Sequence, residues 1–184
     1  MKTQEHISQG LEIERKFVVP DKPAFLKDCD CKRIRQGYLA VGKNGTEVRI
    51  RQEGKRYFLT IKSGRGKARV EEEVRINRKQ FDSLWPLTRG RRVRKVRYFA
   101  SHHDRTLEVD VYRRKLKGLV TAEVEFADTK SARAFEPPEW VGREVTNDED
   151  FRNQSLALNG MPEESADTAP AKGHNGRHSA RNGR

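Results

Sequence analysis

Six short stretches of this chain alternate apolar and charged residues, and the charges within each stretch are almost all of one sign. Residues two apart in a β-strand share a face and lie about 6.5–7 Å apart. A sheet face exposed to water normally mixes both signs, because like charges repel. Strands that separate acids from bases are better suited to holding metal ions and a polyanion together. The clearest cases are Glu71-Glu72-Glu73, Glu108-Val109-Asp110, Glu123-Val124-Glu125 and Arg49-Ile50-Arg51.

The composition limits the partners of the chain. Charged residues make up 36% of its 184 residues, and the formal net charge is +12. Such a balance points to an anionic partner, which can be a nucleic acid, a membrane surface or a small phosphorylated substrate. Because no apolar run approaches the ~20 residues of a membrane span and the polar N-terminus has no signal-peptide core, we expect a cytoplasmic protein without a membrane partner.

Period-2 alternation and turn residues predict eight strands. Their connections are short, and Lys43-Asn44-Gly45 is typical of a tight hairpin. Sequential strands joined this tightly predict an antiparallel meander, and eight strands can close into a barrel. The predicted fold class is therefore all-β dominated (α+β), an eight-stranded closed antiparallel barrel with a few covering helices. The strands are expected near residues 11–19, 34–41, 46–52, 56–63, 69–76, 92–100, 105–112 and 119–126.

Helical spacing is rarer and predicts only short helices, which we expect to cover part of the barrel exterior. The last residues lack apolar periodicity and are rich in Ser, Pro, Gly and charge, which predicts a disordered tail. The predicted domain spans 11–160, between a flexible N-terminus (1–10) and that tail (161–184). The helices are expected at 77–86, 128–135 and 148–158, with a short turn within 20–28.

Two arrangements place the charges differently. In a sandwich the apolar stripes form the core and the charges face water, whereas in a barrel wrapped by helices the charges line the interior. Segregation of sign over many strands favours the barrel. Lining its interior with charges of both signs is costly unless these charges compensate one another or bind ions. Such an interior suits a triphosphate held by bases, with divalent cations bridging it to carboxylates. The inward acids are Glu12, Glu14, Glu71, Glu73, Glu108, Asp110, Glu123 and Glu125, and the bases are Lys16, Arg49, Arg51, Lys62, Lys95 and Arg97.

A series of motifs between residues 11 and 159 occurs in the order of a known family. The opening Glu12-x-Glu14-x-Lys16 resembles the signature of the CYTH superfamily, the triphosphate tunnel metalloenzymes. Alone it is weak, but followed by an Arg-x-Arg strand, a basic strand and a terminal Glu-x-Glu it is specific. The likeness continues through Arg35-Gln36-Gly37-Tyr38-Leu39, Arg49-Ile50-Arg51, Thr60-Ile61-Lys62-Ser63, Arg97-Tyr98, Glu123-Val124-Glu125-Phe126, Glu144-Val145-Thr146 and Asn153.

The resemblance implies an eight-stranded antiparallel tunnel that acts on triphosphates with Mg²⁺ or Mn²⁺. Compact bacterial members that share the Arg35–Leu39 stretch look like inorganic triphosphatases, which cleave tripolyphosphate to pyrophosphate and phosphate. Class IV adenylate cyclases and thiamine triphosphatases are the alternatives on the same fold. Cyclases tend to carry a His-Phe pair where this chain has Gln9-Gly10-Leu11, which argues against cyclisation.

Phosphoryl transfer needs charge neutralisation and in-line positioning more than covalent work by the protein. Asp110 is expected to bind metal or to position the attacking water, and the resemblance implies that Lys16 works with Tyr38 near the scissile phosphate. Each of these last two residues also has a purely structural alternative, in which Lys16 only pairs with Glu12 and Glu14 and Tyr38 only packs. Guanidinium and ammonium groups should hold the phosphates: Arg49, Arg51, Lys62, Lys95 and Arg97. The expected metal ligands are Glu12, Glu14, Glu123 and Glu125 first, then Asp110 and Glu108, with Glu71 and Glu73 either binding a second metal or only pairing with bases.

A nucleic-acid-binding module is the alternative from another class. The basic run 89–97 and the net charge support it, but few aromatics interleave with that run, and ordered carboxylates would repel a phosphate backbone. We therefore expect a small anionic substrate and no nucleic acid, with the oligomeric state left open, a homodimer included. The remaining bases are expected to form a solvated rim that attracts anions: Arg91, Arg92, Arg94, Arg113, Arg114, Lys115 and Lys117.

Overall fold

The computed structural model describes residues 13–42, 45–63 and 70–163. The predictions made for Glu12, for the N-terminal residues 1–10 and for residues 164–184 of the tail lie outside these ranges. Among the described helices, none combines the length and the apolar character that crossing a membrane requires.

All eight predicted strands are present and form one antiparallel sheet in the order β1-β8-β7-β6-β2-β3-β4-β5. Tight hairpins use backbone with positive φ, at Gly54 between β3 and β4 and at His103 between β6 and β7. The strands are β1 (Ile13–Val18), β2 (Cys31–Val41), β3 (Glu47–Glu53), β4 (Arg56–Ser63), β5 (Val70–Arg75), β6 (Arg92–His102), β7 (Arg105–Tyr112) and β8 (Val120–Phe126).

Helical structure is present in each predicted segment, although segment 148–158 is divided at the extended Arg152 into a 3-10 helix and an α-helix. Two of the caps match the sequence signals. Asn77 accepts a hydrogen bond from the Gln80 backbone, and the Gln80 side chain returns one to Asn77, which forms a capping box. Asp128 caps the next helix through the backbone of Ser131. The α-helices are α1 (Arg78–Leu84), α2 (Thr129–Ala134) and α3 (Asn153–Leu158), and the 3-10 helices are η1 (Ala24–Asp28), η3 (Trp85–Thr88), η4 (Arg114–Leu116) and η5 (Glu149–Phe151).

The strand order is not the predicted simple meander. β1 pairs with β8 rather than with β2, and β2 lies between β3 and β6. The reason is the long connections: η1 lies between β1 and β2, and α1 with η3 lies between β5 and β6, so neither pair is held together by a tight turn. The expectation that the first and last strands are neighbours is confirmed, with Lys16 opposite Glu123.

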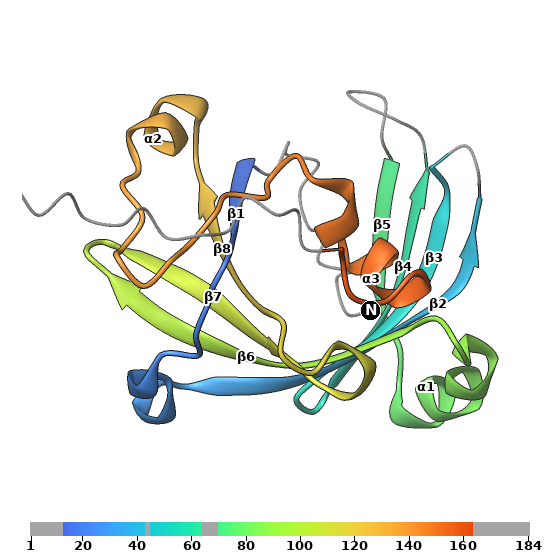
Figure 1. Cartoon of the computed structure of the whole chain (residues 1–184). Coiled ribbons are helices and arrows are strands. Elements are labelled where there is room, and N and C mark those ends of the chain that lie inside the picture. The colour runs from blue at the N-terminus through green and yellow to red at the C-terminus, as the bar shows by residue number, and fades with distance from the viewer. Residues whose placement is uncertain (1–12, 43–44, 64–69, 164–184) are drawn as a thin grey trace, which may run out of the picture.

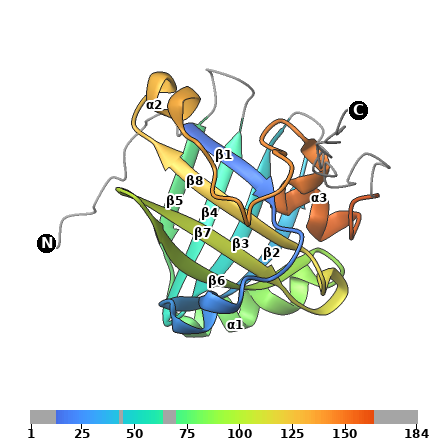
Figure 2. The ribbon, with the colours of Figure 1, turned by 60° about the vertical axis from the view of Figure 1, so that its left-hand side comes forward.

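The sheet curls so that its two halves face each other (Figures 1 and 2). We call β1, β8, β7 and β6 the first wall and β2, β3, β4 and β5 the second wall; the inner face is the one that each wall turns toward the other. The sheet edges are β1 and β5, each six residues long, and no ladder joins these edges within the described ranges. Closure of the barrel therefore stays a prediction.

Part of the outer face is apolar and lies under helices, as the barrel interpretation predicts, although Ile61 and Val74 of the second wall stay exposed. On the first wall, Phe17, Val109 and Val124 belong to a buried cluster with Leu26 of η1 and Ala132 of α2. The second wall carries a smaller cluster on its outer side, formed by Ile50, Phe81 and Trp85 under α1 and η3. Both clusters bury residues that alternate with the predicted site residues, which leaves the acids and bases of the predicted site on the inner face.

One predicted exterior helix lies elsewhere. α3 and η5 pack on the inner face at one end of the sheet, where Leu156 and Phe151 share a buried cluster with Tyr38, Val93 and Tyr112. The prediction that all helices cover the exterior is wrong for this segment. Its physical reason is that these three inner-facing strand residues are apolar or aromatic and need a hydrophobic cover.

Candidate active site

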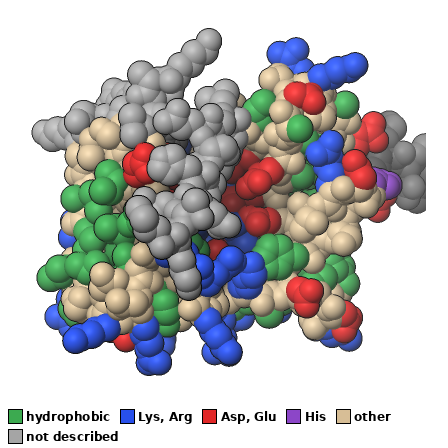
Figure 3. Space-filling view, turned by 180° about the vertical axis from the view of Figure 1, so that it is seen from behind, with side chains coloured by type: hydrophobic (Ala, Val, Ile, Leu, Met, Phe, Trp, Pro, Cys, Tyr) green, Lys and Arg blue, Asp and Glu red, His purple; other side chains and the backbone are tan. Residues whose placement is uncertain are grey.

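Within the described ranges, the predicted bases and acids share the inner face of the two walls. Figure 3 shows acidic and basic side chains next to one another in the middle of one side of the molecule, between groups of hydrophobic side chains. Alternation places them there: Arg97 has inward parity on β6, Asp110 on β7 and Glu123 on β8, while their neighbours Val109 and Val124 point outward into the core.

Arg97 is the centre of one ionic network on the first wall. Its guanidinium donates to Asp110 through two nitrogens, at 2.9 and 2.7 Å, and to Glu123 at 2.9 Å. It also pairs with Glu108, and Lys95 pairs with Asp110. Asp110 is 0% exposed and Lys95 3%, so this pair lies completely inside the protein.

Lys16 connects β1 to this network and to η5. Its ammonium lies 2.8 Å from the Glu123 carboxylate and donates to the Phe151 carbonyl at 2.7 Å. An ammonium has three N–H donors, and these two contacts account for two of them. The first wall therefore links three bases to three acids: Lys16, Lys95 and Arg97 with Glu108, Asp110 and Glu123.

The network shifts the pKa values of its members in opposite directions. Burial alone would raise the pKa of Glu123, but Lys16, Lys95 and Arg97 outweigh it and lower that pKa far below its ordinary value. Burial lowers the pKa of Lys95 in spite of Asp110. Burial raises the pKa of Glu108 against the opposing effect of Arg97, and the neighbouring carboxylates of Asp110, Glu123 and Glu125 add to the rise. Glu108 thus lies among carboxylates that repel its negative charge.

The second wall pairs its charges locally. Arg51 lies 3.2 Å from Glu73, which also accepts a hydrogen bond from Thr60 at 2.8 Å. Lys62 lies 2.5 Å from Glu71, with which it is in register. In the structure Glu71 and Glu73 therefore pair with bases, which is one of the two predicted alternatives. The Glu71 side chain is 40% exposed.

Two buried donors on the second wall have no acceptor. The Nε atoms of Arg49 and Arg51 are out of contact with solvent, and neither finds a hydrogen-bond partner among the described residues. Arg49 pairs with Glu47 at 3.4 Å and with Glu71 at 3.9 Å, in both cases through its terminal nitrogens. A buried unsatisfied donor costs roughly 1–3 kcal/mol, so these N–H groups favour a ligand that brings acceptor oxygens.

Tyr38 is placed by β2 on the inner face and is buried. Its hydroxyl accepts a hydrogen bond from the Gln36 amide at 2.7 Å, and it lies opposite Arg49 in the ladder. Burial raises the pKa of Tyr38 well above its ordinary value, against the opposing effect of Arg49, so the phenol stays protonated. Tyr38 and Lys16 lie on strands separated by β8, β7 and β6, and the ion pair and hydrogen bonds described for them join other groups. Their cooperation stays a prediction.

The predicted metal ligands lie on neighbouring strands of the first wall, apart from Glu71 and Glu73 on the second wall and Glu12 outside the described residues. Glu14 is opposite Glu125, and Glu108 is opposite Glu123. Glu14 and Glu125 are exposed, while Glu123 and Asp110 are engaged by bases. In the described part of the chain, no three acidic, cysteine or histidine side chains are gathered in a metal-binding arrangement. The donor set is made of carboxylates on adjacent strands, which is the chemistry that hard divalent cations take.

Sequence reasoning missed the contribution of η5 and α3 to this site. The Phe151 carbonyl accepts from Lys16, and the Asn153 side chain accepts from Tyr112 at 3.1 Å and lies 3.5 Å from Lys95. In the sequence, Asn153 belongs only to the motifs that carry the family resemblance. The apolar inward positions at Val93 and Tyr112 were the signal that could have placed a helix at this end.

Two curated proteins are similar to this chain in sequence over nearly their whole length. An inorganic triphosphatase of Nitrosomonas europaea is 45% identical over 148 residues, which are 80% of this chain and 97% of the relative. An inorganic triphosphatase of Acetivibrio thermocellus is 34% identical over 152 residues, 82% of this chain and 95% of the relative.

The fold is also similar to that of a solved inorganic triphosphatase. A crystal structure of an inorganic triphosphatase matches with a TM-score of 0.67 and 42% identity, covering 82% of this chain and 96% of that one. The model of the CYTH domain matches residues 10–150, which include both walls and the network around Arg97. The chain therefore belongs to the CYTH domain family.

Proposed function

We propose that this protein hydrolyses inorganic triphosphate to pyrophosphate and phosphate with a divalent cation, Mg²⁺ or Mn²⁺, in a tunnel enclosed by the inner faces of the two walls. Support comes from the relatives named inorganic triphosphatases and from paired acids and bases on one inner face. The first wall supplies mostly the carboxylates, and the second wall supplies the phosphate-binding donors.

The observation that carries the proposal is the pair of unsatisfied Nε donors on Arg49 and Arg51. A guanidinium presents its donors in a fork that matches two phosphate oxygens. The two arginines are two residues apart on β3 and therefore lie about 6.5–7 Å apart on one face. Adjacent phosphates of one chain can then occupy both forks, and Lys62 on the neighbouring strand adds a third cation.

Lys16 and Tyr38 provide the remaining donors. The third N–H of the Lys16 ammonium is not accounted for by Glu123 or Phe151 and is assigned to the oxygen that leaves with the product. Because its pKa is raised, Tyr38 acts as a hydrogen-bond donor to phosphate and not as a base. Asp110, tied to Lys95 and Arg97, holds these cations in place; its predicted role toward water remains part of the proposal.

A divalent cation fits the first wall. Glu14, Glu125 and Glu108 would hold it, with Glu123 beside them and Glu12 contributing from outside the described residues. The raised pKa of Glu108 reflects burial and crowded carboxylates, and a cation there would relieve that repulsion. When bound, it would neutralise phosphate charge and lower the barrier to attack by water. Glu71 and Glu73 remain candidates for a second ion.

Phosphate release from tripolyphosphate, ATP and thiamine triphosphate tests the proposal, each with Mg²⁺, Mn²⁺ or EDTA. Metal-dependent cleavage confined to tripolyphosphate is the expected result. Lys16→Ala and Arg51→Ala should remove turnover, whereas Arg56→Ala, an exposed arginine paired with Glu53 at the next hairpin, should retain it. Cyclic AMP or thiamine diphosphate as the main product would change the substrate, and full activity in both site variants would refute the site.

A further inference from the structure

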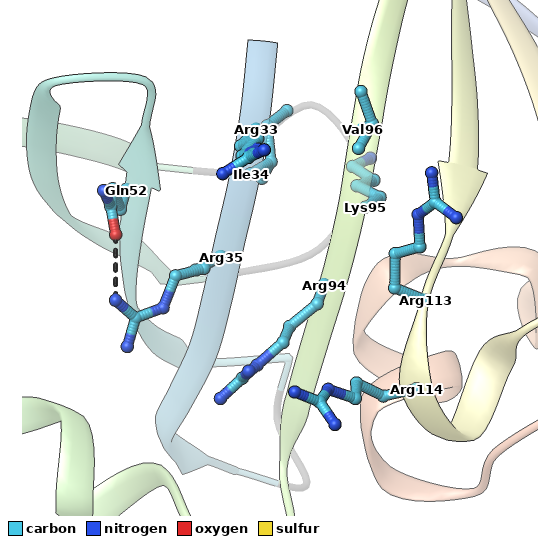
Figure 4. A pocket seen from close by; sticks show the side chains of 9 residues that line it. All are labelled: Arg33, Ile34, Arg35, Gln52, Arg94, Lys95, Val96, Arg113 and Arg114. Carbon is cyan, nitrogen blue, oxygen red and sulfur yellow. Dashed lines mark hydrogen bonds between the residues drawn. The ribbon is translucent and has the colours of Figure 1, made fainter.

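A second group of bases lies on the outer face, where β2 and β6 pair. We call it the outer arginine patch. Five of its arginines line a pocket of about 480 Å³, and Arg92 lies beside them on the same face of β6. Figure 4 shows Arg94 and Arg114 extending toward the same region, while Arg35 reaches Gln52. The patch consists of Arg33, Arg35, Arg92, Arg94, Arg113 and Arg114.

The patch differs from the inner face because its charge is not compensated. Within the described ranges, none of its six arginines lies within ion-pair distance of a carboxylate. Arg35 is directly opposite Arg94 in the ladder, a position where like charges destabilise a sheet. The acid whose charge acts on Arg35 is Asp82, which is itself paired with Arg78.

The local structure holds these guanidinium groups together in spite of their repulsion. The Trp85 ring has Arg35 at 4.4 Å and Arg92 at 4.3 Å from its centroid, and Arg92 also donates to Thr88 at 2.8 Å. Burial lowers the pKa of Arg35, and Arg94 lowers it further. Arg114 has a φ of 62°, a conformation that costs energy for a residue with a side chain. Positive charge is therefore concentrated at an energetic cost.

The dimensions and chemistry of the patch identify its ligand class. Its arginines occupy two adjacent strands and the turn at η4, so they form a two-dimensional array and not a single row. Trp85 is almost fully buried and lies against two guanidinium groups, so the patch offers no aromatic face on which an unpaired base can stack. The ligand that fits carries several phosphates spread over a surface, to match the array of arginines, and has no unpaired bases that need an aromatic side chain for stacking.

We infer that the outer arginine patch binds the sugar-phosphate backbone of a nucleic acid duplex, independently of base sequence. The carboxylates that argued against nucleic acid in the sequence lie on the inner face, on the other side of β6 and β2, and do not face this ligand. Guanidinium forks bind phosphate oxygens and release the counterions of the duplex, which makes such binding strongly salt-dependent. This function is separate from triphosphate hydrolysis.

The test is fluorescence anisotropy of a labelled duplex of about 20 base pairs, in DNA and RNA forms, with the full chain in EDTA. Binding is measured between about 50 and 200 mM salt, where counterion release gives its largest changes. Arg94→Gln combined with Arg114→Gln should weaken binding by about tenfold or more and reduce the salt slope by about 2. Triphosphate hydrolysis by the same variant should be unchanged.

The matched control is Lys130→Gln combined with Arg133→Gln, which removes two positive charges from α2, outside the first wall. It should retain the affinity and the salt slope of the unsubstituted chain. Equal weakening by the control, or no binding of the duplex at about 50 mM salt, would overturn the inference. Tighter binding of a single strand or of long-chain polyphosphate than of the duplex would also overturn it.

Discussion

The two walls of the sheet carry the same kinds of charged side chains but pair them in different ways. On the first wall, the single residue Arg97 contacts three acids, Asp110, Glu123 and Glu108. Lys95 and Lys16 join the same network through Asp110 and Glu123. On the second wall, Arg51 pairs with Glu73 and Lys62 with Glu71, in contacts confined to neighbouring strands.

This difference separates two tasks that a charged interior must perform. A network that satisfies buried charges with one another is rigid, because removing one member leaves the others uncompensated in a poorly polarisable environment. Local pairs that leave N–H groups of Arg49 and Arg51 unsatisfied can accept a ligand without dismantling the structure. We therefore regard the Arg97 network of the first wall as the supporting part of the site and the second wall as its receiving half, while Lys16 and the proposed cation ligands of the first wall act on the bound substrate.

The largest effect on stability should come from Asp110→Asn. The substitution leaves the buried Lys95 and Arg97 without their shared carboxylate, and breaking such a buried pair costs about 3–5 kcal/mol. For a chain of this size, the melting temperature should fall on the order of 10 °C. Urea and thermal unfolding measure the change. Glu73→Gln on the second wall should cost about 1 kcal/mol, and an equal loss in both variants would remove the distinction between the walls.

Arg51→Ala should have the opposite profile, with a large loss of activity and a small loss of stability. Removing a donor that stabilises developing charge typically costs 10²–10³-fold in turnover, about 2.7–4 kcal/mol. Its partly exposed pair with Glu73 contributes no more than about 1 kcal/mol to folding. Phosphate release and urea unfolding should be measured on the same preparation. A variant that loses stability but keeps its turnover would show that Arg51 supports the fold and does not hold the substrate.

Much of this arrangement could be predicted from the sequence, because period-2 alternation determines which side chains share a face. The strand positions and the inward parity of Arg97, Asp110 and Glu123 follow from that pattern. Alternation does not show which strands are neighbours. The β2–β6 pairing and the separation of β1 from β2, both across long connections, therefore depart from the predicted meander.

The position of α3 could not be read from its own sequence. Its amphipathic pattern requires an apolar surface but does not say on which face of the sheet that surface lies. Tyr38, Val93 and Tyr112 supply it on the inner face, and only the three-dimensional register brings them together. The same limit applies to Asn153, whose contacts with Tyr112 and Lys95 depend on that placement.

A smaller effect, confined to acid pH, should appear within the first wall. The pKa of Glu123 is lowered in the folded state, so the unfolded chain takes up this proton first as the pH falls below about 4.3. The stability that Glu123 provides is present above that pH and is lost as the pH falls toward the folded pKa. The raised pKa of Glu108 acts in the opposite sense, adding stability as the pH falls through it toward the unfolded value.

Unfolding free energies measured from neutral to acid pH distinguish these two carboxylates. The difference between the unsubstituted chain and Glu123→Gln should shrink on acidification below about pH 4.3. Relative to Glu108→Gln, the unsubstituted chain should instead gain stability as the pH falls. Parallel pH profiles for both variants would contradict the assignment of opposite shifts to neighbouring groups of one network.

The smallest effect should come from the outer side of the second wall. Asn77→Ala removes the capping box of α1 and should cost about 1 kcal/mol in unfolding free energy. α1 packs through Phe81 against Ile50, which lies between Arg49 and Arg51 on the opposite face of β3. If β3 is held mainly by its ladders with β2 and β4, turnover should be unchanged. If turnover falls with stability, then the receiving half depends on the helix behind it, and the positions of its two arginines are set by packing on the outer face as well as by pairing within the sheet.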